Sequence, residues 1–590
     1  MRMDLLPSKK ALTCFAALAL AQAVTLCAGE DAAWVRLKDP LDVGRVKAGE
    51  TLFENRNYTF ESFPQELEGL AFARGEIESS FRVEVVKDGW LRALTSAPEN
   101  KAAHGQSESL KKQGFQEAAD GKRYQLFGTS AADRVCLYSK AVKAGETYAF
   151  QRWTVVAAGQ MEESPFKKLI ARYAREEAVG KNVRENLLFM QPDYVVFIPK
   201  QRREIVGDRY NDHFQVFGKP DGTLFAAWTQ ASKEGDVDQH VCFAKSADKG
   251  KTWTEPMILA GSPNNVNPQP IASWQQPMVS KSGRLYVLWN QRVSNDPLHH
   301  GIMVGKYSDD NGETWSQPRV VPFPHVNRDP ADKPPSWCIW QRPLRLGKDG
   351  KYIVGLTRHG VVSGEKATDA ALRYEQENKD KQMQSKLAGS TVEFIQYDNI
   401  DDDPKVEDIR VVLLAANEKE MAVVDPKWGL CCQEASIVNL PDGRLFALMR
   451  TSAGSPYWTQ SRDKGLNWDQ PKPLKDAQGA AYKHPCSPCP IYDRRGPEAC
   501  SGEYFAFVSN EERDEKNAYQ PRGPLFLIAG KFDPQGEQPI RFAAPKPFPS
   551  RPAGNAFYTS LTVVEGKTVL WIPDWKHFLI GKVIGDEWFE

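Results

Sequence analysis

One eight-residue pattern occurs three times in this 590-residue chain and constrains its fold more than any other feature, at residues 246–253, 308–315 and 461–468. Each copy reads Ser-x-Asp-x-Gly-x-Thr/Asn-Trp. Ser and Asp side chains bond nearby backbone amides in tight turns, and Gly readily adopts a positive φ angle. A Trp can pack such a turn against neighbouring strands, so the three copies predict a repeated β-structure.

A second, longer repeat predicts the number of units. A turn with glycine precedes a strand-like apolar run six times, and the glycines are Gly222, Gly283, Gly350, Gly443, Gly502 and Gly566. Intervals of roughly 60 residues suit four-stranded blades, so residues 191–590 are predicted to form a six-bladed β-propeller. The longest interval contains the polar, helix-prone segment 363–390, which is expected to be an insertion, either a surface excursion or a lid.

The chain begins with features of an export signal. Basic residues, among them Arg2 and Lys9, precede an apolar run, and Ala23 and Ala28 fit the small-residue rule for cleavage. Residues 1–28 are therefore predicted to be a signal peptide, and the protein to be secreted or periplasmic. No later segment is apolar enough to predict a membrane span.

The region between the signal peptide and the repeats is predicted to hold a smaller β-sandwich-like domain, at residues 29–160. Strand-like runs flank Asp88-Gly89, a hairpin signal. Sugar binding and a purely structural role both remain open for this domain. Residues 161–190 predict a linker helix, because Ser164 suits an N-cap, Pro165 suits the first helical position and apolar residues follow at helical spacing.

Charge and cysteine content limit the chemistry. The 76 basic and 76 acidic residues give a formal net charge of zero, which argues against a nucleic-acid or polybasic membrane binder. A small pocket needs only a few cations, so an anionic ligand stays compatible with this balance. The two-residue spacing between Cys486 and Cys489 is typical of a redox or metal site. No second cysteine pair or His cluster in the sequence supports a zinc site. We expect disulfides or buried thiols, with no metal and no cofactor.

The repeat register gathers polar side chains at one end of the predicted propeller axis. Residues just before each turn glycine belong to the innermost strand of a blade, which lines a central funnel. The polar residues at or near these positions include His213, Gln276, Arg342, Glu434 and Tyr558. Polar groups beside apolar blade cores favour a sugar-binding site, and the alternative is that they satisfy one another inside the channel.

These repeats resemble the sialidase (neuraminidase) superfamily, and residues 200–590 are most similar to bacterial BNR-repeat, or Asp-box, sialidase-like proteins. The resemblance implies an all-β, sialidase-like six-bladed propeller. It also implies a tyrosine nucleophile with a glutamate base, because a carboxylate nucleophile would be repelled by an acidic sugar. Arginines would hold the sugar carboxylate, and an aspartate on a loop would act as general acid/base.

Several segments carry the resemblance residue by residue. The segment from Gln433-Glu434 to Arg450 is similar to the one that joins the base to an arginine. Pro521-Arg522-Gly resembles the segment of another arginine, and Phe557-Tyr558-Thr that of the nucleophile. Asp238-Gln-His240 is similar to the acid/base loop, in which Asp236 is a rival. The resemblance therefore implies Tyr558 as nucleophile, Glu434 as base and Asp238 as acid/base.

The first blade departs from the family pattern. Asp212 stands where the family has its first arginine, and Arg209 comes three residues too early. The carboxylate clamp is therefore either incomplete or completed by Arg342, Arg292 or Arg358.

We thus expect an exported exo-glycosidase, a sialidase acting on sialylated or other acidic glycans. The predicted substrate-binding residues are Arg450, Arg522, Arg342, His213, Asp212, Gln433 and His240. Two alternatives stay open. One is a glycan-active enzyme that uses His213 or His240 for acid–base chemistry. The other is a propeller that binds sugar without turnover.

Overall fold

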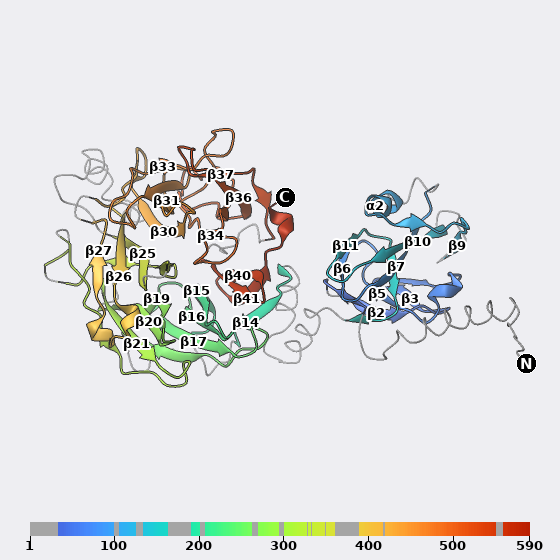
Figure 1. The fold of residues 1–590 in the computed structure, drawn as a ribbon, viewed down its shortest axis with the longest axis horizontal. Coiled ribbons are helices and arrows are strands. Elements are labelled where there is room, and N and C mark those ends of the chain that lie inside the picture. The colour runs from blue at the N-terminus through green and yellow to red at the C-terminus, as the bar shows by residue number, and fades with distance from the viewer. Residues whose placement is uncertain are drawn as a thin grey trace, which may run out of the picture. The chain divides into compact units, whose positions relative to one another are not determined.

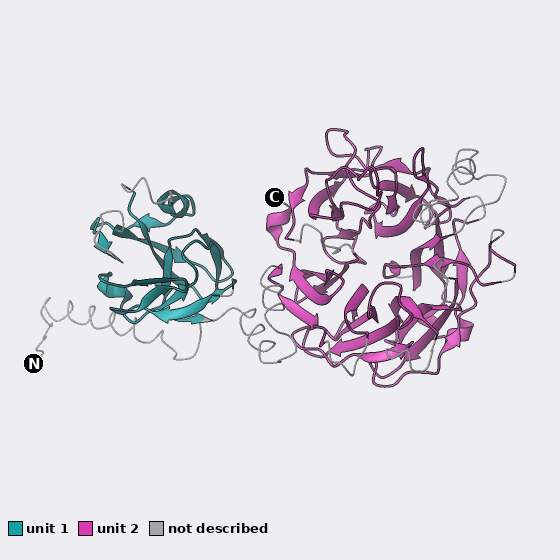
Figure 2. Cartoon of the chain, turned by 180° about the vertical axis from the view of Figure 1, so that it is seen from behind, with its two compact units in different colours: residues 1–172 teal, residues 173–590 magenta. Residues whose placement is uncertain are grey.

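The computed structural model describes residues 34–39, 41–98, 106–125, 134–162, 190–200, 207–261, 270–293, 300–326, 329–331, 333–347, 350–359, 389–416, 419–549 and 558–589. The predicted signal peptide and nearly all of the predicted linker helix and of the predicted insertion lie outside these ranges. The chain divides into two compact units, residues 1–172 and 173–590, which Figure 2 shows in different colours.

The described part of the chain is all-β. Its α-helix with described bounds is α2 (Gln106–Lys112), and the remaining helical segments are short 3₁₀ turns, namely η1 (Gln65–Leu67), η3 (Ile400–Asp402), η4 (Val406–Asp408) and η5 (Asp586–Trp588). The sequence prediction of an all-β chain is confirmed.

The first unit contains two larger sheets, and one buried apolar cluster draws residues from both of them. The four-stranded sheet has the order β11 (Thr147–Phe150), β6 (Phe81–Val85), β1 (Val35–Leu37) and β13 (Met161–Glu162). The seven-stranded sheet has the order β2 (Asp42–Arg45), β5 (Ala71–Arg74), β12 (Val155–Ala158), β7 (Gly89–Ser96), β10 (Arg134–Val142) and β8 (Gln116–Glu117), with β9 (Tyr124–Gln125) beside β10. A small hairpin pairs β3 (Thr51–Phe53) with β4 (Arg56–Thr59).

The second unit contains six sheets of four or five strands among its described residues, and Figure 1 shows them around a common centre. The first three are β14 (Tyr194–Phe197), β41 (Phe578–Val583), β40 (Lys567–Asp574) and β39 (Ser560–Val564); β15 (Tyr210–Gly218), β16 (Leu224–Ala231), β17 (His240–Ser246) and β18 (Met257–Ala260); and β19 (Ala272–Val279), β20 (Leu285–Arg292), β21 (Gly301–Ser308) and β22 (Arg319–Val320).

The next three sheets follow the same antiparallel order along the chain. They are β23 (Trp337–Cys338), β25 (Lys351–Arg358), β26 (Thr391–Tyr397) and β27 (Val411–Leu413), with β24 (Leu344–Leu346) beside β25; β30 (Cys432–Asn439), β31 (Leu445–Thr451), β32 (Tyr457–Ser461) and β33 (Lys472–Pro473); and β34 (Ile491–Asp493), β35 (Glu503–Val508), β36 (Phe526–Phe532) and β37 (Ile540–Phe542), with β38 (Lys546–Pro547) beside β36. A short hairpin, β28 (Val424–Asp425) and β29 (Gly429–Leu430), precedes β30.

One sheet joins the beginning and the end of the second unit. The early strand β14 pairs with the last strand, β41, and Val195 lies opposite Ile580. The residues between these strands carry the other five sheets, so this pairing ties the first described part of the unit to its last.

The eight-residue turns join the third and fourth strands of three sheets and fasten each sheet to its neighbour. In the first turn, Ser246 Oγ accepts a bond from Gly250 N at 2.8 Å, and Asp248 Oδ1 accepts one from Thr252 N at 2.8 Å. The φ angle of Gly250 is +88°, as such a turn requires. The three Trp rings pack on aromatic rings of the preceding sheet, in the pairs Trp253–Trp571, Trp315–Phe243 and Trp468–Phe394. The predicted role of the pattern is confirmed.

The innermost strands of three sheets carry the same β-bulge. The register shifts between Asp212 and Gln215 in β15, between Ser273 and Gln276 in β19, and between Gln433 and Ser436 in β30. Within each bulge one non-glycine residue has a left-handed backbone, and these residues are His213 (φ 51°), Trp274 (φ 55°) and Glu434 (φ 53°). Such a bulge turns a side chain out of the regular alternation of the strand, and strained residues of this kind cluster at functional sites.

Candidate active site

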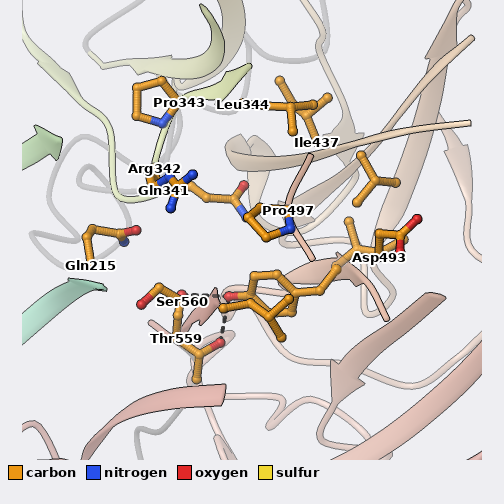
Figure 3. A pocket seen from close by; sticks show the side chains of 14 residues that line it. Gln215, Gln341, Arg342, Pro343, Leu344, Ile437, Asp493, Pro497, Thr559 and Ser560 are labelled. Atoms are coloured by element: carbon orange, nitrogen blue, oxygen red, sulfur yellow. Dashed lines mark hydrogen bonds between the residues drawn. The ribbon is translucent and has the colours of Figure 1, made fainter. Parts of the chain in front are cut away.

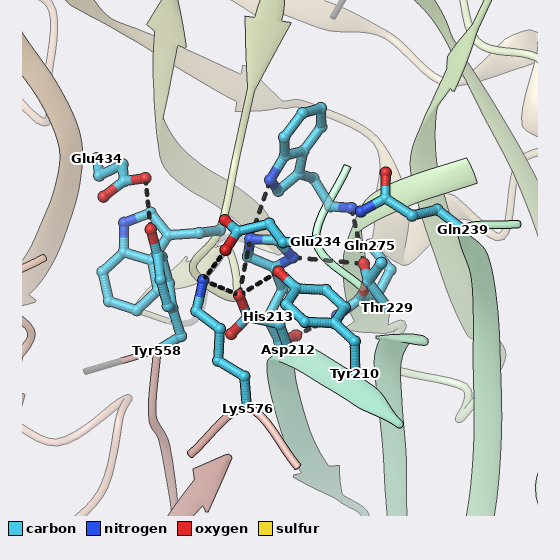
Figure 4. Close-up of polar contacts among 12 residues, drawn as sticks. Tyr210, Asp212, His213, Thr229, Glu234, Gln239, Gln275, Glu434, Tyr558 and Lys576 are labelled. Atoms are coloured by element: carbon cyan, nitrogen blue, oxygen red, sulfur yellow. Dashed lines mark hydrogen bonds and ion pairs between the residues drawn. The ribbon is translucent and has the colours of Figure 1, made fainter. Parts of the chain in front are cut away.

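Tyr558, Glu434 and Arg450 form one buried, hydrogen-bonded cluster. Tyr558, which precedes β39, donates from its hydroxyl to Glu434 Oε1 at 3.0 Å. Arg450 Nη1, from β31, donates to Glu434 Oε2 at 2.7 Å and to the Tyr558 hydroxyl at 3.4 Å. The structure thus brings together the predicted nucleophile, its predicted base and one predicted arginine, and Figure 4 shows the Tyr558–Glu434 bond.

The ring of Tyr558 is held between three other side chains. Trp340 and His213 meet it edge to face, with ring centroids 5.4 and 5.1 Å away. Lys576 Nζ lies 4.9 Å from the ring centroid. These contacts fix the ring, and the hydroxyl stays within reach of Glu434. Sequence reasoning gave no signal for this role of Trp340.

Electrostatics keep the Tyr558 hydroxyl protonated in the free protein. Burial raises the pKa of Tyr558 well above its usual value, and the charge of Glu434 raises it further, while Arg450 and Arg522 act in the opposite direction. The phenol is therefore neutral and donates its proton toward Glu434. A nucleophilic attack by this oxygen needs a base at the bonded position, and Glu434 Oε1 occupies it.

A lysine pairs with Asp212, the residue that stands where the family pattern has its first arginine. Lys576, in the turn after β40, places Nζ 2.9 Å from Asp212 Oδ2 and 3.0 Å from Glu234 Oε2. Tyr210 also donates to Asp212 Oδ2, at 2.7 Å. Burial opposes ionisation of Asp212, but the charge of Lys576, with the hydrogen bond from Tyr210, lowers the pKa of its carboxyl below the usual value. Figure 4 shows Lys576 between the two carboxylates.

His213 lies beside this ion pair but is occupied by neighbours. The indole of Trp274 donates to His213 Nε2 at 3.0 Å, so Nε2 is an acceptor. Nδ1 lies 3.4 Å from the hydroxyl oxygen of Thr229, which itself donates to Gln275 Oε1 at 3.0 Å and therefore accepts from Nδ1. Burial lowers the pKa of His213. His213 is thus a neutral imidazole with both nitrogens engaged, which disfavours the hypothesis that it acts as acid or base.

The structure does not support the predicted acid/base role of Asp238. Asp238 is fully buried, and its carboxylate accepts bonds from the backbone N and hydroxyl of Ser232, the latter at 2.6 Å. His240 is also buried, with its ring nitrogens 2.7 Å from Asp238 O and 3.1 Å from Gln230 Oε1. Among the described residues, neither side chain contacts Tyr558. Both residues stabilise the loop between β16 and β17.

Glu234 is the carboxylate of that loop which faces the cluster. Its side chain is 66% exposed, yet its carboxylate contacts Lys576, which lies over Tyr558. The charge of Lys576 lowers the pKa of Glu234, although partial desolvation of the carboxyl and the nearby charge of Asp212 both act to raise it. The sequence contains three carboxylates in this loop, Glu234, Asp236 and Asp238, and its spacing alone gave no reason to choose Glu234.

Arg522 and Arg450 share one aromatic neighbour. Their guanidinium carbons lie 5.4 and 5.2 Å from the ring centroid of Tyr519. Arg522 Nε is buried without a hydrogen-bond partner, and within the described ranges no carboxylate pairs with Arg522. Arg522 is therefore a cation that an anionic ligand can still neutralise. Sequence reasoning identified both arginines but missed Tyr519.

The structure places the remaining predicted residues elsewhere. Arg342 lies 3.6 Å from Glu498. It lines a cavity together with Gln215 and Gln341, as Figure 3 shows. Gln433 donates to Ser390 Oγ at 2.8 Å and pairs with Arg450 only through the backbone ladder.

The two other arginines proposed to complete the clamp are engaged in the interior. Arg358 is bound by Asp329 and Glu393, at 2.6 and 2.9 Å. Arg292 donates to Gln239 Oε1 at 3.0 Å and is buried. The cation that lies over the Tyr558 ring is Lys576.

Among the described residues, no three His, Cys, Asp or Glu side chains gather as a metal ion requires. No helix there is both long and apolar enough to cross a membrane.

Comparison with known families and structures found one family and several distant structural relatives. The BNR repeat-like domain family matches residues 222–481. No curated protein matches the chain. Among solved structures, the NanB sialidase of Streptococcus pneumoniae is 10% identical, with a TM-score of 0.46 and coverage of 88% of this chain and 84% of that chain.

Two further solved structures are similar at the same low level. The intramolecular trans-sialidase from Ruminococcus gnavus is 13% identical, with a TM-score of 0.44 and coverage of 64% of this chain and 95% of that chain. The alpha-L-arabinanase of Penicillium chrysogenum is 15% identical, with a TM-score of 0.40 and coverage of 67% and 98%.

Proposed function

We propose that this chain, a member of the sialidase-like BNR superfamily through its repeat domain at residues 222–481, is an exo-glycosidase with a tyrosine nucleophile. The single observation that carries the proposal is the bond between the Tyr558 hydroxyl and Glu434 Oε1 at 3.0 Å, with Arg450 bonded to both. A tyrosine replaces the usual carboxylate nucleophile in sialidases. We therefore propose terminal sialic acid, or a closely related acidic sugar, as substrate.

The proposed reaction has two displacements. Tyr558 Oη attacks the anomeric carbon while its proton moves to Glu434, and the bond to the leaving-group oxygen breaks as that oxygen takes a proton from an acid. Water then attacks the anomeric carbon and gives its proton to the conjugate base of that acid, while the bond to Tyr558 breaks and the phenol regains its proton from Glu434. Two inversions at one carbon give net retention of configuration.

Glu234 is the proposed acid that protonates the leaving group. It is the exposed carboxylate that the loop between β16 and β17 brings to the cluster, through its contact with Lys576. A sugar carboxylate that approaches Lys576 competes with Glu234 for the ammonium group. Release of Glu234 from Lys576 removes the charge that lowers its pKa, so Glu234 becomes a better proton donor once substrate is bound.

Three cations are proposed to hold the acidic group of the sugar. Arg450 and Arg522 flank Tyr519, and Lys576 lies over Tyr558. Arg522 has no carboxylate partner among the described residues, so it makes the strongest new ion pair. Each charge-assisted hydrogen bond of this kind contributes about 1.5–3 kcal/mol.

The architecture around the site extends the proposal. The six sheets of the second unit are proposed to be the blades of one six-bladed propeller, closed by the pairing of β14 with β41. Residues 1–28 are proposed to be a signal peptide that directs the protein to the periplasm or the medium.

The test is release of free sialic acid from a sialylated glycoprotein by the purified chain and by its Tyr558→Phe variant. Phe keeps the ring contacts with Trp340 and His213 and removes only the hydroxyl. We expect release by the wild type and a loss of at least about 1,000-fold in the variant, because the nucleophile is gone. No release by the wild type from α2-3, α2-6 or α2-8 linkages would overturn the assignment of the substrate.

A further inference from the structure

Two cysteines that are distant in sequence meet next to the arginine of the candidate active site. Cys431 Sγ and Cys486 Sγ lie 3.6 Å apart, and both side chains are fully buried. Arg450 Nε donates to Cys486 Sγ at 3.4 Å. The proposed reaction uses neither sulfur, so their proximity calls for another explanation.

The pair connects three loops that surround the site. Cys431 directly precedes β30, the strand of Glu434, and its backbone N donates to Val423 O. Cys486 lies in the loop before β34, and its backbone N donates to Ala518 O at 2.6 Å. The next residue, Tyr519, packs against the same buried cluster. A bond between the two sulfurs would tie the start of β30 to the loop segment that carries Tyr519 and Arg522.

The two sulfur atoms differ in their electrostatic surroundings. Burial alone raises the pKa of the Cys486 thiol, but the hydrogen bond from Cys431 and the nearby charge of Arg450 lower it to about 6. The pKa of the Cys431 thiol is raised above its usual value, because this thiol donates the hydrogen bond to Cys486 and is buried. Thiolates, and not thiols, attack disulfides, so Cys486 is in the reactive state near neutral pH.

We propose that Cys431 and Cys486 are joined by a disulfide in the mature protein. The oxidant is a small-molecule or protein disulfide. The Cys486 thiolate attacks one of its sulfurs, which forms a mixed disulfide and releases the first thiolate of the oxidant. Cys431 then loses its proton and attacks the Cys486 sulfur, which releases the second thiolate. Two protein thiols lose two electrons and two protons in total, and the oxidant becomes two thiols.

The timing of the reaction follows from burial. Both sulfurs are inaccessible while the loops around them are closed, so the exchange takes place when these loops open during folding, with Arg450 of β31 still beside Cys486. The two atoms must approach from 3.6 Å to the bond length of about 2.05 Å, a movement of the size that side-chain rotation allows.

The cross-link changes the charge around Arg450. The reduced protein presents Arg450 with the Glu434 carboxylate and the Cys486 thiolate. A disulfide sulfur carries no charge, so only Glu434 then compensates the guanidinium group. The oxidised site therefore offers a larger uncompensated positive charge to an anionic ligand.

Two neighbouring cysteines are matched controls. The spacing of Cys486 and Cys489 raised a redox pair as one interpretation, but the structure gives Cys486 the partner Cys431. Cys432 instead contacts Met449 Sδ through its sulfur, at 3.6 Å. Burial raises the pKa of both Cys432 and Cys489, so neither is a thiolate at neutral pH.

The experiment maps the bond by mass spectrometry of the full-length chain. The protein is unfolded, refolded in a mixture of oxidised and reduced glutathione, unfolded again, alkylated and digested with trypsin without reductant. Cleavage after Lys427, Arg444, Lys483 and Arg494 gives the peptides 428–444 and 484–494, each with two cysteines. We expect these peptides to be joined in the wild type and in a Cys432→Ser/Cys489→Ser double variant, and to separate in Cys431→Ser.

Alkylation of all four cysteines in the wild type would overturn the proposal, and so would a cross-link that disappears in the double variant. A second measurement is the melting temperature of the double variant. We expect dithiothreitol to lower it by several degrees and to leave that of Cys431→Ser unchanged, because a disulfide constrains the unfolded chain. Equal shifts would contradict the cross-link. Neither measurement requires glycosidase activity, so this proposal can fail or stand independently of the proposed function.

Discussion

The innermost strands β15 and β30 share one backbone device and use it in different ways. Each has a β-bulge with a left-handed residue, His213 in β15 and Glu434 in β30. Glu434 bonds to Tyr558 and Arg450, whereas both ring nitrogens of His213 are engaged by Trp274 and Thr229. The bulge therefore only presents a side chain at the centre. The neighbours of that side chain decide whether it takes part in chemistry or in support.

The largest expected effect is on kcat, and it distinguishes the role of Glu434 in one bulge from that of His213 in the other. Glu434→Gln should lower kcat by about 100- to 1,000-fold, because the amide accepts no proton from Tyr558. His213→Gln should change kcat by less than tenfold, since the imidazole only supports the ring of Tyr558. Steady-state kinetics on a sialoside with both variants checks the prediction, with melting curves as control. A comparable loss in His213→Gln would show that β15 also contributes chemistry.

The next effect concerns stability, and it comes from the buried ion pair between Lys576 and Asp212 at the β15 bulge. Lys576→Met leaves the fully buried Asp212 without its cation, and breaking a buried ion pair costs about 3–5 kcal/mol of unfolding free energy. The double variant Lys576→Met/Asp212→Asn removes both charges and should recover much of that loss. Urea unfolding monitored by tryptophan fluorescence measures both variants. A single variant as stable as the wild type would mean that the pair does not stabilise the β15 region.

A smaller effect distinguishes the carboxylates of the loop after β16. Glu234→Gln should lower kcat by about 100-fold for an alkyl sialoside and far less for an activated aryl sialoside, whose leaving group needs no proton. Asp238→Asn should instead reduce stability, because Asp238 holds the Ser232 backbone, and should show no such dependence on the leaving group. If Asp238→Asn carries the leaving-group dependence, the acid has been assigned to the wrong residue.

The smallest effect is a dependence of stability on pH. Burial lowers the pKa of His213 in the folded protein, so the unfolded chain binds the proton more tightly. Its contribution to stability is therefore complete at neutral pH and decreases as pH falls below about 6.5, the usual value for histidine. His213→Gln should reduce the loss of unfolding free energy between pH 7 and pH 5 by up to about 1–2 kcal/mol. Identical pH profiles for the two proteins would refute a buried neutral His213.

Much of this architecture could be predicted because repeats encode local turns. The glycines that mark the six repeats, Gly222, Gly283, Gly350, Gly443, Gly502 and Gly566, all have positive φ angles in the structure. The same register led to Glu434 and Tyr558, the family resemblance led to Arg450, and the structure brings the three together. Residues that lie at matching positions of repeated strands share a face, so spacing placed Glu434 and Tyr558 at the centre, while their proposed roles came from the resemblance.

The remaining site residues were not predictable because they act from outside the repeat. Lys576 reaches Asp212 from the turn after β40, more than 360 positions along the chain. Tyr519 and Glu234 lie in loops, where no periodicity links position to direction. Spacing therefore gave no way to choose between Asp238, whose carboxylate turns toward Ser232, and Glu234, whose carboxylate turns toward Lys576.

The most direct test of the central claim is the identity of the residue that carries the sugar during catalysis. A fluorinated sialosyl fluoride, which slows the second displacement, should leave its sugar attached to Tyr558, and mass spectrometry of the digested protein locates it. The account predicts a modified Tyr558 in the wild type and no modified peptide in Tyr558→Phe. A sugar attached to any other residue, or inactivation of Tyr558→Phe by the same reagent, would contradict it.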